Sequence, residues 1–198
     1  MSGRHGIVVG ITGASGAAIG VRVVERLADN PHCAVHLVVS PAAERTLNEE
    51  IGIDALARLR AIAFRCHPHS DVGASIASGS YPIAGMIVAP CSIRTLSAIA
   101  WGQLDDLLTR AADVQLKERR RLVLLVRESP LHLGHLRAML QATEIGAIIA
   151  PPMPAFYLRP QSLDDAIDQI AARAINLLDL TNLRTPARVW SGSSFDGA

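Results

Sequence analysis

Arg127 and Glu128 stand side by side directly after the apolar run "RLVLLV" (121–126), where a buried strand is expected to end. An arginine at such a point can clamp a phosphate, because its guanidinium presents paired N–H donors to the phosphate oxygens. A neighbouring glutamate can donate or accept a proton. The two residues predict a site for a phosphate-bearing substrate, with a local surface ion pair as the alternative.

A glycine-rich segment, "GITGASG" (10–16), joins an apolar run to a helical pattern near the N-terminus. Glycines let the backbone approach a phosphate closely, and Ser15 can donate a hydrogen bond to that phosphate or to the ring of a ligand. The segment is not the dinucleotide pattern G-x-G-x-x-G, and the next strand ends in Ser40 rather than in a carboxylate. A mononucleotide is therefore favoured over NAD, and a tightly packed turn is the alternative.

A third loop, "PCSIRT" (90–95), places Ser92 and Thr95 where a helix is expected to begin. Hydroxyl side chains at this position cap the helix, and they can equally bind a phosphate. Cys91 lies in the same loop, but no histidine is placed by the sequence to activate its thiol. We interpret Cys91 as a small buried hydrophobe.

The chain contains 18 arginines and a single lysine, Lys117. A composition so rich in arginine suggests that Lys117 supplies a compact ammonium where the wide guanidinium fork would not fit. Arg110 lies seven residues earlier, on the same face of a predicted helix, so the two cations can converge on one anion. The alternative is a solvated run of charge at a helix end.

The elements that must position these loops alternate along the chain, and uniformly apolar runs of strand length lie at 6–12, 34–40, 84–90, 121–126 and 146–151. Between them, apolar residues at helical spacing predict helices at 16–29, 41–49, 92–100, 107–120, 131–143 and 162–180. The alternation predicts an α/β fold with a doubly wound parallel sheet. Ligands bind beyond the carboxyl ends of such strands, where the loops named above would meet. The segment 53–83 is less regular and predicts a surface excursion with one weak strand.

Composition limits the function classes. We expect a single domain over 1–190 and a disordered tail at 191–198, and the 49% of hydrophobic residues against 19% charged favours burial in a homo-oligomer. A net charge of +1 without a basic stripe gives no support for nucleic acid. Three cysteines without Cys-x-x-Cys spacing, and no leader or long apolar run, predict a cytoplasmic protein without a membrane span. The histidine pairs lack a third ligand, so no metal site is expected.

Several long motifs, in order, resemble the UbiX flavin prenyltransferases: "GITGASGA", "IASGS", "GMIVAPCSIRTLSAIA", "LLTRAADVQLKERRRLVLLVRESPLHLGHL" and "EIGAIIAPPMPAFYLRPQSLDD". The resemblance covers most of the chain and implies a flavodoxin-like Rossmann domain, a three-layer α/β/α fold, assembled into a dodecamer. It implies transfer of the dimethylallyl group of dimethylallyl phosphate to N5 and C6 of reduced FMN. The prenylated FMN so made would serve UbiD-type decarboxylases as their cofactor.

The resemblance also implies roles for individual residues. Those that look like FMN contacts are Gly13, Ala14, Ser15, Ser40, Ser92, Ile93, Arg94, Thr95 and Arg127. Those that look like contacts of dimethylallyl phosphate are Lys117, Tyr157 and Arg173, with Arg110 and Arg127 nearby. Glu128 would protonate the departing phosphate without a metal, and the site would be shared between subunits.

A proton relay is implied for Ser15 and a glutamate after the second strand. Its spacing from Ser40 indicates Glu50, with Glu49 a close competitor. Two positions depart from the family pattern: Pro41 stands where a lysine is common, and Ile19 where a tyrosine is frequent. Both could alter FMN affinity or the preference between a monophosphate and a pyrophosphate.

Two other functions fit the same fold. Flavin-dependent cysteine decarboxylases carry Pro-x-Met-Asn-x-x-Met-Trp where this chain reads "PPMPAFY" (151–157), so the asparagine is missing. A non-catalytic FMN-binding subunit is the second alternative, because binding loops can outlast chemistry. The joint presence of Lys117, Glu128, Tyr157 and Arg173 favours the prenyltransferase.

Overall fold

The structure is a computed structural model that describes residues 4–183 and 187–188. The predicted tail 191–198 lies outside the described residues. Within them, a six-stranded parallel sheet has the order β3-β2-β1-β4-β5-β6. Its strands are β1 (His5–Ile11), β2 (Cys33–Val39), β3 (Arg65–His67), β4 (Ile83–Cys91), β5 (Arg121–Val126) and β6 (Ile148–Ile149).

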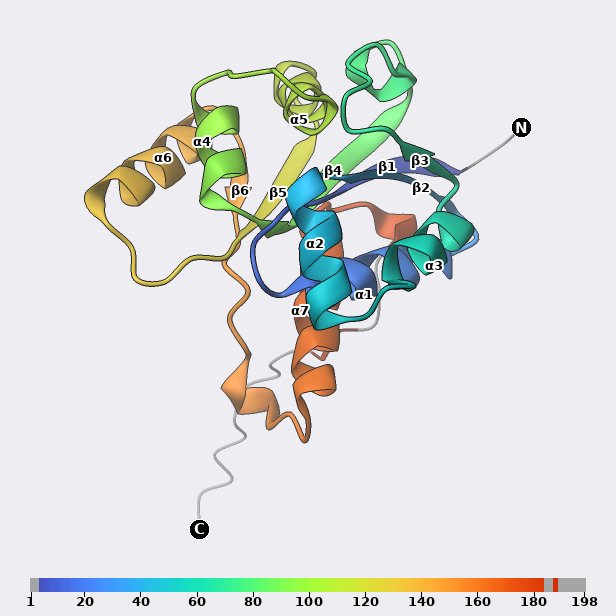
Figure 1. Ribbon diagram of the computed structural model, residues 1–198, viewed down its shortest axis with the longest axis vertical. Helices are drawn as coiled ribbons and strands as arrows, with labels where there is room; N and C mark the ends of the chain where they lie inside the picture. The colour runs from blue at the N-terminus through green and yellow to red at the C-terminus, as the bar shows by residue number, and fades with distance from the viewer. Residues whose placement is uncertain (1–3, 184–186, 189–198) are drawn as a thin grey trace.

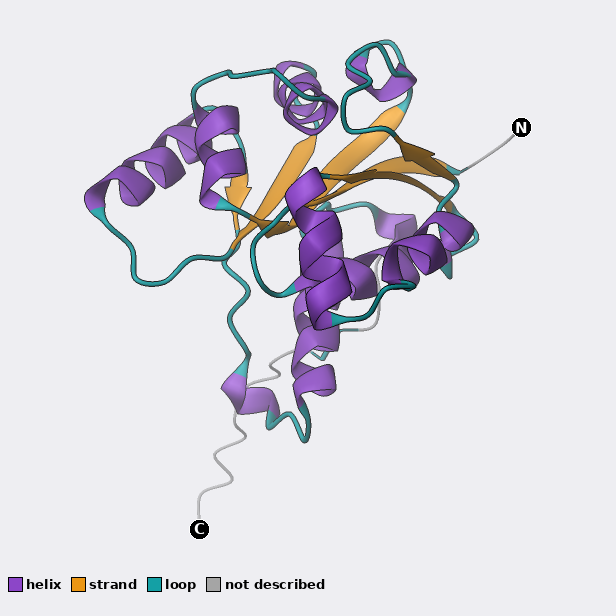
Figure 2. Cartoon of the chain, viewed as in Figure 1, coloured by secondary structure: helices purple, strands orange, loops and turns teal. Residues whose placement is uncertain are grey.

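Helices cover both faces of this sheet, as Figure 2 shows. The helices of the described chain are α1 (Ala17–Ala28), α2 (Pro41–Glu50), α3 (Ala55–Ile62), α4 (Ile93–Ala100), α5 (Leu107–Lys117), α6 (Leu133–Glu144) and α7 (Leu163–Asn176). Short 3₁₀ turns are η1 (Ser75–Ala77), η2 (Phe156–Leu158) and η3 (Thr181–Leu183). The arrangement is the predicted three-layer α/β/α fold.

The two faces of the sheet build two separate cores. In β1, Val9 packs with α1, α3 and α7 on one face, whereas Val8 packs with α4, α5 and α6 on the other (Figure 1). Successive side chains of a strand point to opposite faces, so a strand covered on both faces must be apolar throughout. This is why the strands appear in the sequence as uniform rather than alternating apolar runs.

The order of the strands reverses between β1 and β4, which pair in parallel from Gly6 to Gly10. Without the short edge strand β3, the order is that of flavodoxin-like doubly wound sheets, 2-1-3-4-5. Ligands of such sheets bind in the crevice at the carboxyl ends of the two central strands. The loop after β1 is the glycine-rich segment, and the loop after β4 carries Ser92.

The predicted excursion at 53–83 contains the weak strand, β3, but it also contains a helix that the sequence pattern did not predict, α3. Ala55 and Leu59 lie four residues apart and are buried in the core, so one short face suffices to dock this helix. The predicted helix 107–120 ends earlier, at Lys117, since Arg119 adopts a left-handed φ of 56° that cannot continue a helix. No helix of the described residues is long and apolar enough to cross a membrane.

Candidate functional site

Thr12, the first residue after β1, ties the two central loops together. Its hydroxyl donates to the carbonyl of Pro90 at 2.7 Å and accepts from the backbone N–H of Ser92 at 2.8 Å. The side chain is only 1% exposed, so both bonds are shielded from water. Because a buried hydroxyl is costly to leave unpaired, these bonds set the spacing between the glycine-rich loop and the start of α4.

The glycine-rich loop also touches the start of α2. A Cβ added at Gly13 would lie 2.5 Å from the Cβ of Ala42, which real side chains do not tolerate. Gly16 has a φ of 100°, a conformation that favours glycine, and it precedes the first turn of α1. The loop that carries Ala14 and Ser15 is therefore shaped by close approach as well as by backbone freedom.

The N-terminus of α1 is capped by a carboxylate from another helix. Glu50, the last residue of α2, accepts hydrogen bonds from the backbone N–H groups of Gly16 at 2.9 Å and Ala17 at 2.8 Å. The side chain of Ser15 hydrogen-bonds to the same carboxylate. A negative charge is favoured here because the amide dipoles of the helix point toward it.

Partial burial by itself would raise the pKa of the Glu50 carboxyl, but the hydrogen bonds from Ser15 and the two amides, with the charge of Arg127, outweigh it and lower the pKa below its ordinary value. The carboxylate therefore stays ionised and can accept a proton through Ser15. Glu49 points elsewhere: it accepts a hydrogen bond from Arg45 at 2.8 Å on the exposed side of α2. Of the two candidates for the relay, Glu50 is the one that the fold brings to Ser15.

The N-terminus of α4 provides a second set of backbone amides at the same edge. Ser92 accepts from the backbone N–H of Thr95 at 3.3 Å and donates to the hydroxyl of Thr95 at 3.1 Å. Ile93 and Arg94 form the first turn between them, and the Arg94 side chain is 75% exposed, 3.7 Å from Asp106. Since Glu50 already occupies the amides of α1, the start of α4 is the better place for a ligand's phosphate.

Three further predicted residues border this edge. Ser40 is buried and caps α2, accepting from the backbone N–H of Ala43 at 3.2 Å. The backbone N–H of Arg127 donates to the carbonyl of Cys91 at 3.0 Å, which ties the loop after β5 to the end of β4. The side chain of Glu128 accepts from the N–H of Ser129 at 3.0 Å and forms no ion pair with Arg127 within the described residues. The alternative of a local ion pair thus finds no counterpart here.

Tyr157 and Arg173 line one cavity of about 170 Å³ beside the end of β5. Tyr157 lies in the turn η2 and Arg173 in the last part of α7, with Leu125 of β5 and Pro151 forming part of the wall. A phenol and a guanidinium around a partly apolar hollow suit a small ligand that has an anionic end and a hydrocarbon end.

Lys117 and Arg110 lie elsewhere in the chain. Lys117 ends α5 just before β5 begins, so it lies at the amino edge of the sheet, where its ammonium pairs with Glu118 beside Gly79. Arg110 pairs with Asp113 at 2.8 Å on the same helix. A single chain therefore does not bring Lys117 together with Tyr157, and each cation has its own carboxylate.

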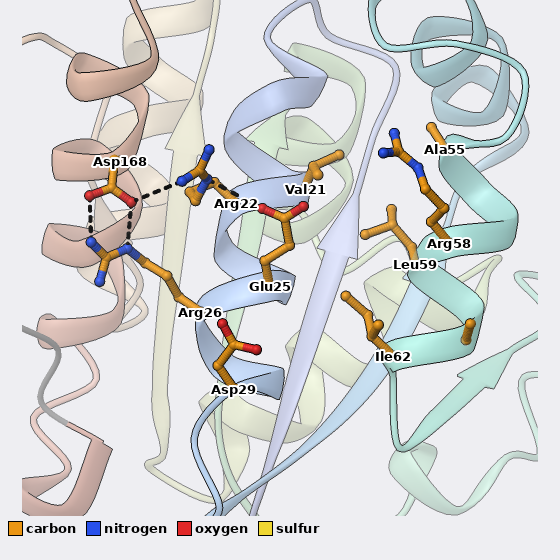
Figure 3. Close-up of a pocket in the computed structure, with 11 residues that line it drawn as sticks. Val21, Arg22, Glu25, Arg26, Asp29, Ala55, Arg58, Leu59, Ile62 and Asp168 are labelled. Carbon is orange, nitrogen blue, oxygen red and sulfur yellow. Dashed lines mark hydrogen bonds and ion pairs between the residues drawn. The ribbon is translucent and has the colours of Figure 1, made fainter.

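The largest cavity, about 670 Å³, lies away from these loops, between α1 and α3 (Figure 3). Figure 3 shows Asp168 of α7 joined to Arg26 and Arg22 of α1, and Arg22 joined to Glu25. None of the residues predicted to act on a ligand lines it, and its arginines are already paired. We therefore place the candidate site at the carboxyl edge of the sheet rather than in this larger hollow.

Sequence reasoning missed three features near these sites. Thr12 was visible as a hydroxyl at the end of an apolar strand, but its bonds to another loop were not. His36 and His67 form a buried pair with Nδ1 and Nε2 3.0 Å apart, joined by β2 and β3 pairing, and burial lowers the pKa of His36 to about 4. The described residues contain no cluster of three metal-ligating side chains. Cys91 is fully buried, and burial raises the pKa of its thiol.

The fold and the loops at its centre are those of a flavoprotein, and a family model described as Flavoprotein matches residues 1–179. The flavin prenyltransferase UbiX of Escherichia coli strain K12 is 52% identical over 187 residues, which are 94% of this chain and 98% of that protein. The chain belongs to the UbiX flavin prenyltransferase family.

Two solved structures agree with this assignment. The crystal structure of AnUbiX (PadA1) in complex with FMN and dimethylallyl pyrophosphate superposes with a TM-score of 0.89 at 45% identity, covering 96% of this chain and all of that one (100%). A dodecameric FMN-dependent UbiX-like decarboxylase from Escherichia coli O157:H7 superposes with a TM-score of 0.85 at 42% identity, covering 88% of this chain and 95% of that one.

Proposed function

We propose that this protein is a flavin prenyltransferase that joins the dimethylallyl group of dimethylallyl phosphate to N5 and C6 of reduced FMN. The observation that carries the proposal is the Ser15–Glu50 pair at the N-terminus of α1, next to Arg127 and on the central loops of a flavoprotein fold. The identity to the UbiX relative of E. coli, 52%, extends over nearly the whole chain and supports it.

The residues of the central loops fit FMN. The phosphate is expected at the first turn of α4, where Ser92, Ile93, Arg94 and Thr95 provide amides, hydroxyls and a cation. The ring is expected along Gly13, Ala14 and Ser15, with Ser40 and Arg127 at its border. When bound and reduced, FMN supplies the nucleophilic nitrogen and carbon to which the prenyl group becomes attached.

Ser15 and Glu50 would move the proton that ring closure releases. Attack through C6 must be followed by loss of the proton on that carbon. The hydroxyl of Ser15 can accept this proton while it donates its own to Glu50, whose lowered pKa keeps it ionised and ready as the acceptor. Glu50 is itself held by two backbone amides, so the relay is oriented before the substrate arrives.

The other predicted residues would act on the leaving group. Cleavage of the allylic C–O bond leaves its electron pair on the phosphate oxygen, and cations fixed beforehand stabilise that charge without a metal. Arg173 and Tyr157 border the cavity at the end of β5, and Arg127 follows the same strand. Glu128 follows Arg127 and would supply the proton that the departing phosphate takes up.

Lys117 and Arg110 would reach this site from a second copy of the chain. They lie at the amino edge of the sheet, remote from the cavity of Tyr157 and Arg173, so one copy cannot supply the whole set. We propose a homo-oligomer in which one subunit's α5 faces another subunit's cavity. A dodecamer, the form of the E. coli O157:H7 relative, would satisfy this requirement.

A UbiD-type decarboxylase is proposed as the recipient of the prenylated FMN, and the cytoplasm as the place of the reaction. The experiment that tests the function is an anaerobic incubation of the purified protein with reduced FMN and dimethylallyl phosphate, followed by mass spectrometry of the released flavin. A gain of one C5 unit on FMN supports the proposal. Unmodified FMN, released from a protein that binds it tightly, would favour a cysteine decarboxylase or a binding subunit instead.

A further inference from the structure

The cavity of Tyr157 and Arg173 has a third cationic neighbour that the sequence motifs did not single out. Arg188 lies 15 residues beyond Arg173, after the turn η3, yet it lines the same cavity. It belongs to a segment that returns over α7 and the turn η2. The chain thus brings a second guanidinium to the cavity from a separate part of the sequence.

Two hydrogen bonds hold Arg188 at this place. Its backbone N–H donates to Oε1 of Gln169 on α7 at 3.0 Å, and its Nη1 donates to the carbonyl of Leu158 in η2 at 3.3 Å. Gln169 also lines the cavity. A guanidinium has five N–H donors, and the bond to Leu158 uses one of them, so the group can be anchored and still bind an anion.

No protein carboxylate neutralises the two arginines. Neither Arg173 nor Arg188 forms an ion pair among the described residues. Arg188 does border a smaller hollow with Asp165 and Asp168, but both carboxylates are engaged: Asp165 accepts from the N–H of Gln161 at 2.9 Å, and Asp168 pairs with Arg26. Two cations around one hollow repel each other unless an anion lies between them.

We infer that Arg188 is a further substrate-binding residue, which donates to the phosphate end of the allylic substrate together with Arg173 and Tyr157. The inference rests on the proposed function for the identity of the substrate, but not for the presence of an anion site. Arginine binds phosphate through paired N–H donors, and such charge-assisted bonds are about twice as strong as neutral ones. The residue would act on binding of the substrate and leave the FMN loops unaffected.

The test replaces Arg188 by glutamine and compares the KM for dimethylallyl phosphate and the Kd for FMN with those of the unchanged protein. We expect Arg188→Gln to raise KM about 10-fold or more while kcat at saturation and the Kd for FMN stay the same, because uniform binding is lost. Arg188→Lys keeps the charge without the fork and should fall between them. Arg159→Gln is the matched control, since this exposed arginine lies two residues after Tyr157 but does not line the cavity.

Gln169→Leu removes the acceptor that anchors the backbone of Arg188, so it should raise KM in the same direction. An unchanged KM in Arg188→Gln, or an equal rise in Arg159→Gln, would overturn the inference. Binding of inorganic pyrophosphate to the FMN-loaded protein, followed by calorimetry, gives a readout without turnover. If the unchanged protein transfers no prenyl group, the proposed function fails, but pyrophosphate binding that Arg188→Gln weakens about 10-fold would still support the anion site.

Discussion

The two edges of the parallel sheet carry cations in different settings. At the carboxyl edge, Arg127, Arg173 and Arg188 have no ion-pair partner within 4.0 Å among the described residues, and they border loops and a cavity. At the amino edge, Lys117 and Arg110 are each paired with a neighbouring carboxylate on α5. The sequence motifs assign members of both groups to one phosphate. The difference teaches that one chain builds the flavin site and part of the phosphate site, and that the rest must come from another copy.

Loss of the relay at the carboxyl edge should give the largest effect. Glu50→Gln keeps the size of the side chain but cannot accept a proton, so prenyl transfer should fall by about 100-fold or more. Single-turnover measurement of prenylated FMN checks this, with Glu49→Gln as the control. A loss of similar size in Glu49→Gln would contradict the assignment.

The same carboxylate gives a pH dependence. The pKa of Glu50 is lower in the folded protein than its ordinary value, so the ionised form persists into mild acid and the rate should fall only as the pH approaches that lowered pKa. Stability follows the same sign: the contribution of Glu50 is complete above its unfolded-state pKa and is lost as the pH falls through the folded-state pKa.

A mixture of two inactive variants tests whether the two edges work together. Lys117→Ala and Arg173→Ala should each lower turnover by about 100-fold, because each removes a cation from the departing phosphate. When the two variants are co-expressed and assemble at random, about a quarter of the sites should contain both original residues if they come from different copies. Turnover of the mixture that stays as low as that of either variant would break the comparison.

Thr12→Val tests how far the carboxyl edge depends on the link between its two loops. The change leaves the N–H of Ser92 and the carbonyl of Pro90 without their partner, and FMN affinity should fall about 10-fold. Thr12→Ser retains the hydroxyl and should restore most of the affinity. Thr109→Val removes a buried hydroxyl of α5 that donates to the carbonyl of Asp106, and it should lower stability without changing the Kd for FMN. Equal FMN affinity in Thr12→Val and the unchanged protein would show that the link is not needed.

The smallest effect is expected from the ion pairs that hold α7 to α1. The hydrogen bond and charge of Arg26 lower the pKa of Asp168, whose side chain lies 2.8 Å from Nε of Arg26. Asp168→Asn should cost about 1 kcal/mol of unfolding free energy at neutral pH. The stabilisation is complete above the unfolded-state pKa and is lost as the pH falls through the folded-state pKa, so the difference from the unchanged protein should shrink in acid.

Urea unfolding at neutral and acidic pH measures this difference. Asp164→Asn serves as the control, because Asp164 pairs with Arg22 at 2.7 Å but its side chain is 70% exposed. A cost in Asp164→Asn as large as that in Asp168→Asn would contradict the idea that the more buried pair holds α7. A fall in FMN affinity in either variant would show that the α1–α7 contact reaches the carboxyl edge.

Much of the fold could be predicted from local patterns. The runs at 6–12 and 84–90 became β1 and β4 within one residue at each end, since strands covered on both faces must be apolar throughout. The helix α3 was missed because its buried face is only Ala55 and Leu59, too short a pattern to distinguish from a loop. The predicted strand 146–151 shortened to two residues, Ile148–Ile149, at the edge of the sheet.

By itself, the sequence determined the class of fold, the loops that meet at the carboxyl edge and the residue types available there, because these follow from periodicity and from residues that follow strands. Tertiary structure decided the partners. It brought Glu50 rather than Glu49 to Ser15, joined Thr12 to Ser92 across 80 positions, and carried Arg188 to the cavity of Arg173. It also separated Lys117 from Tyr157. Contacts between distant segments depend on how helices and strands pack, and no local pattern records them.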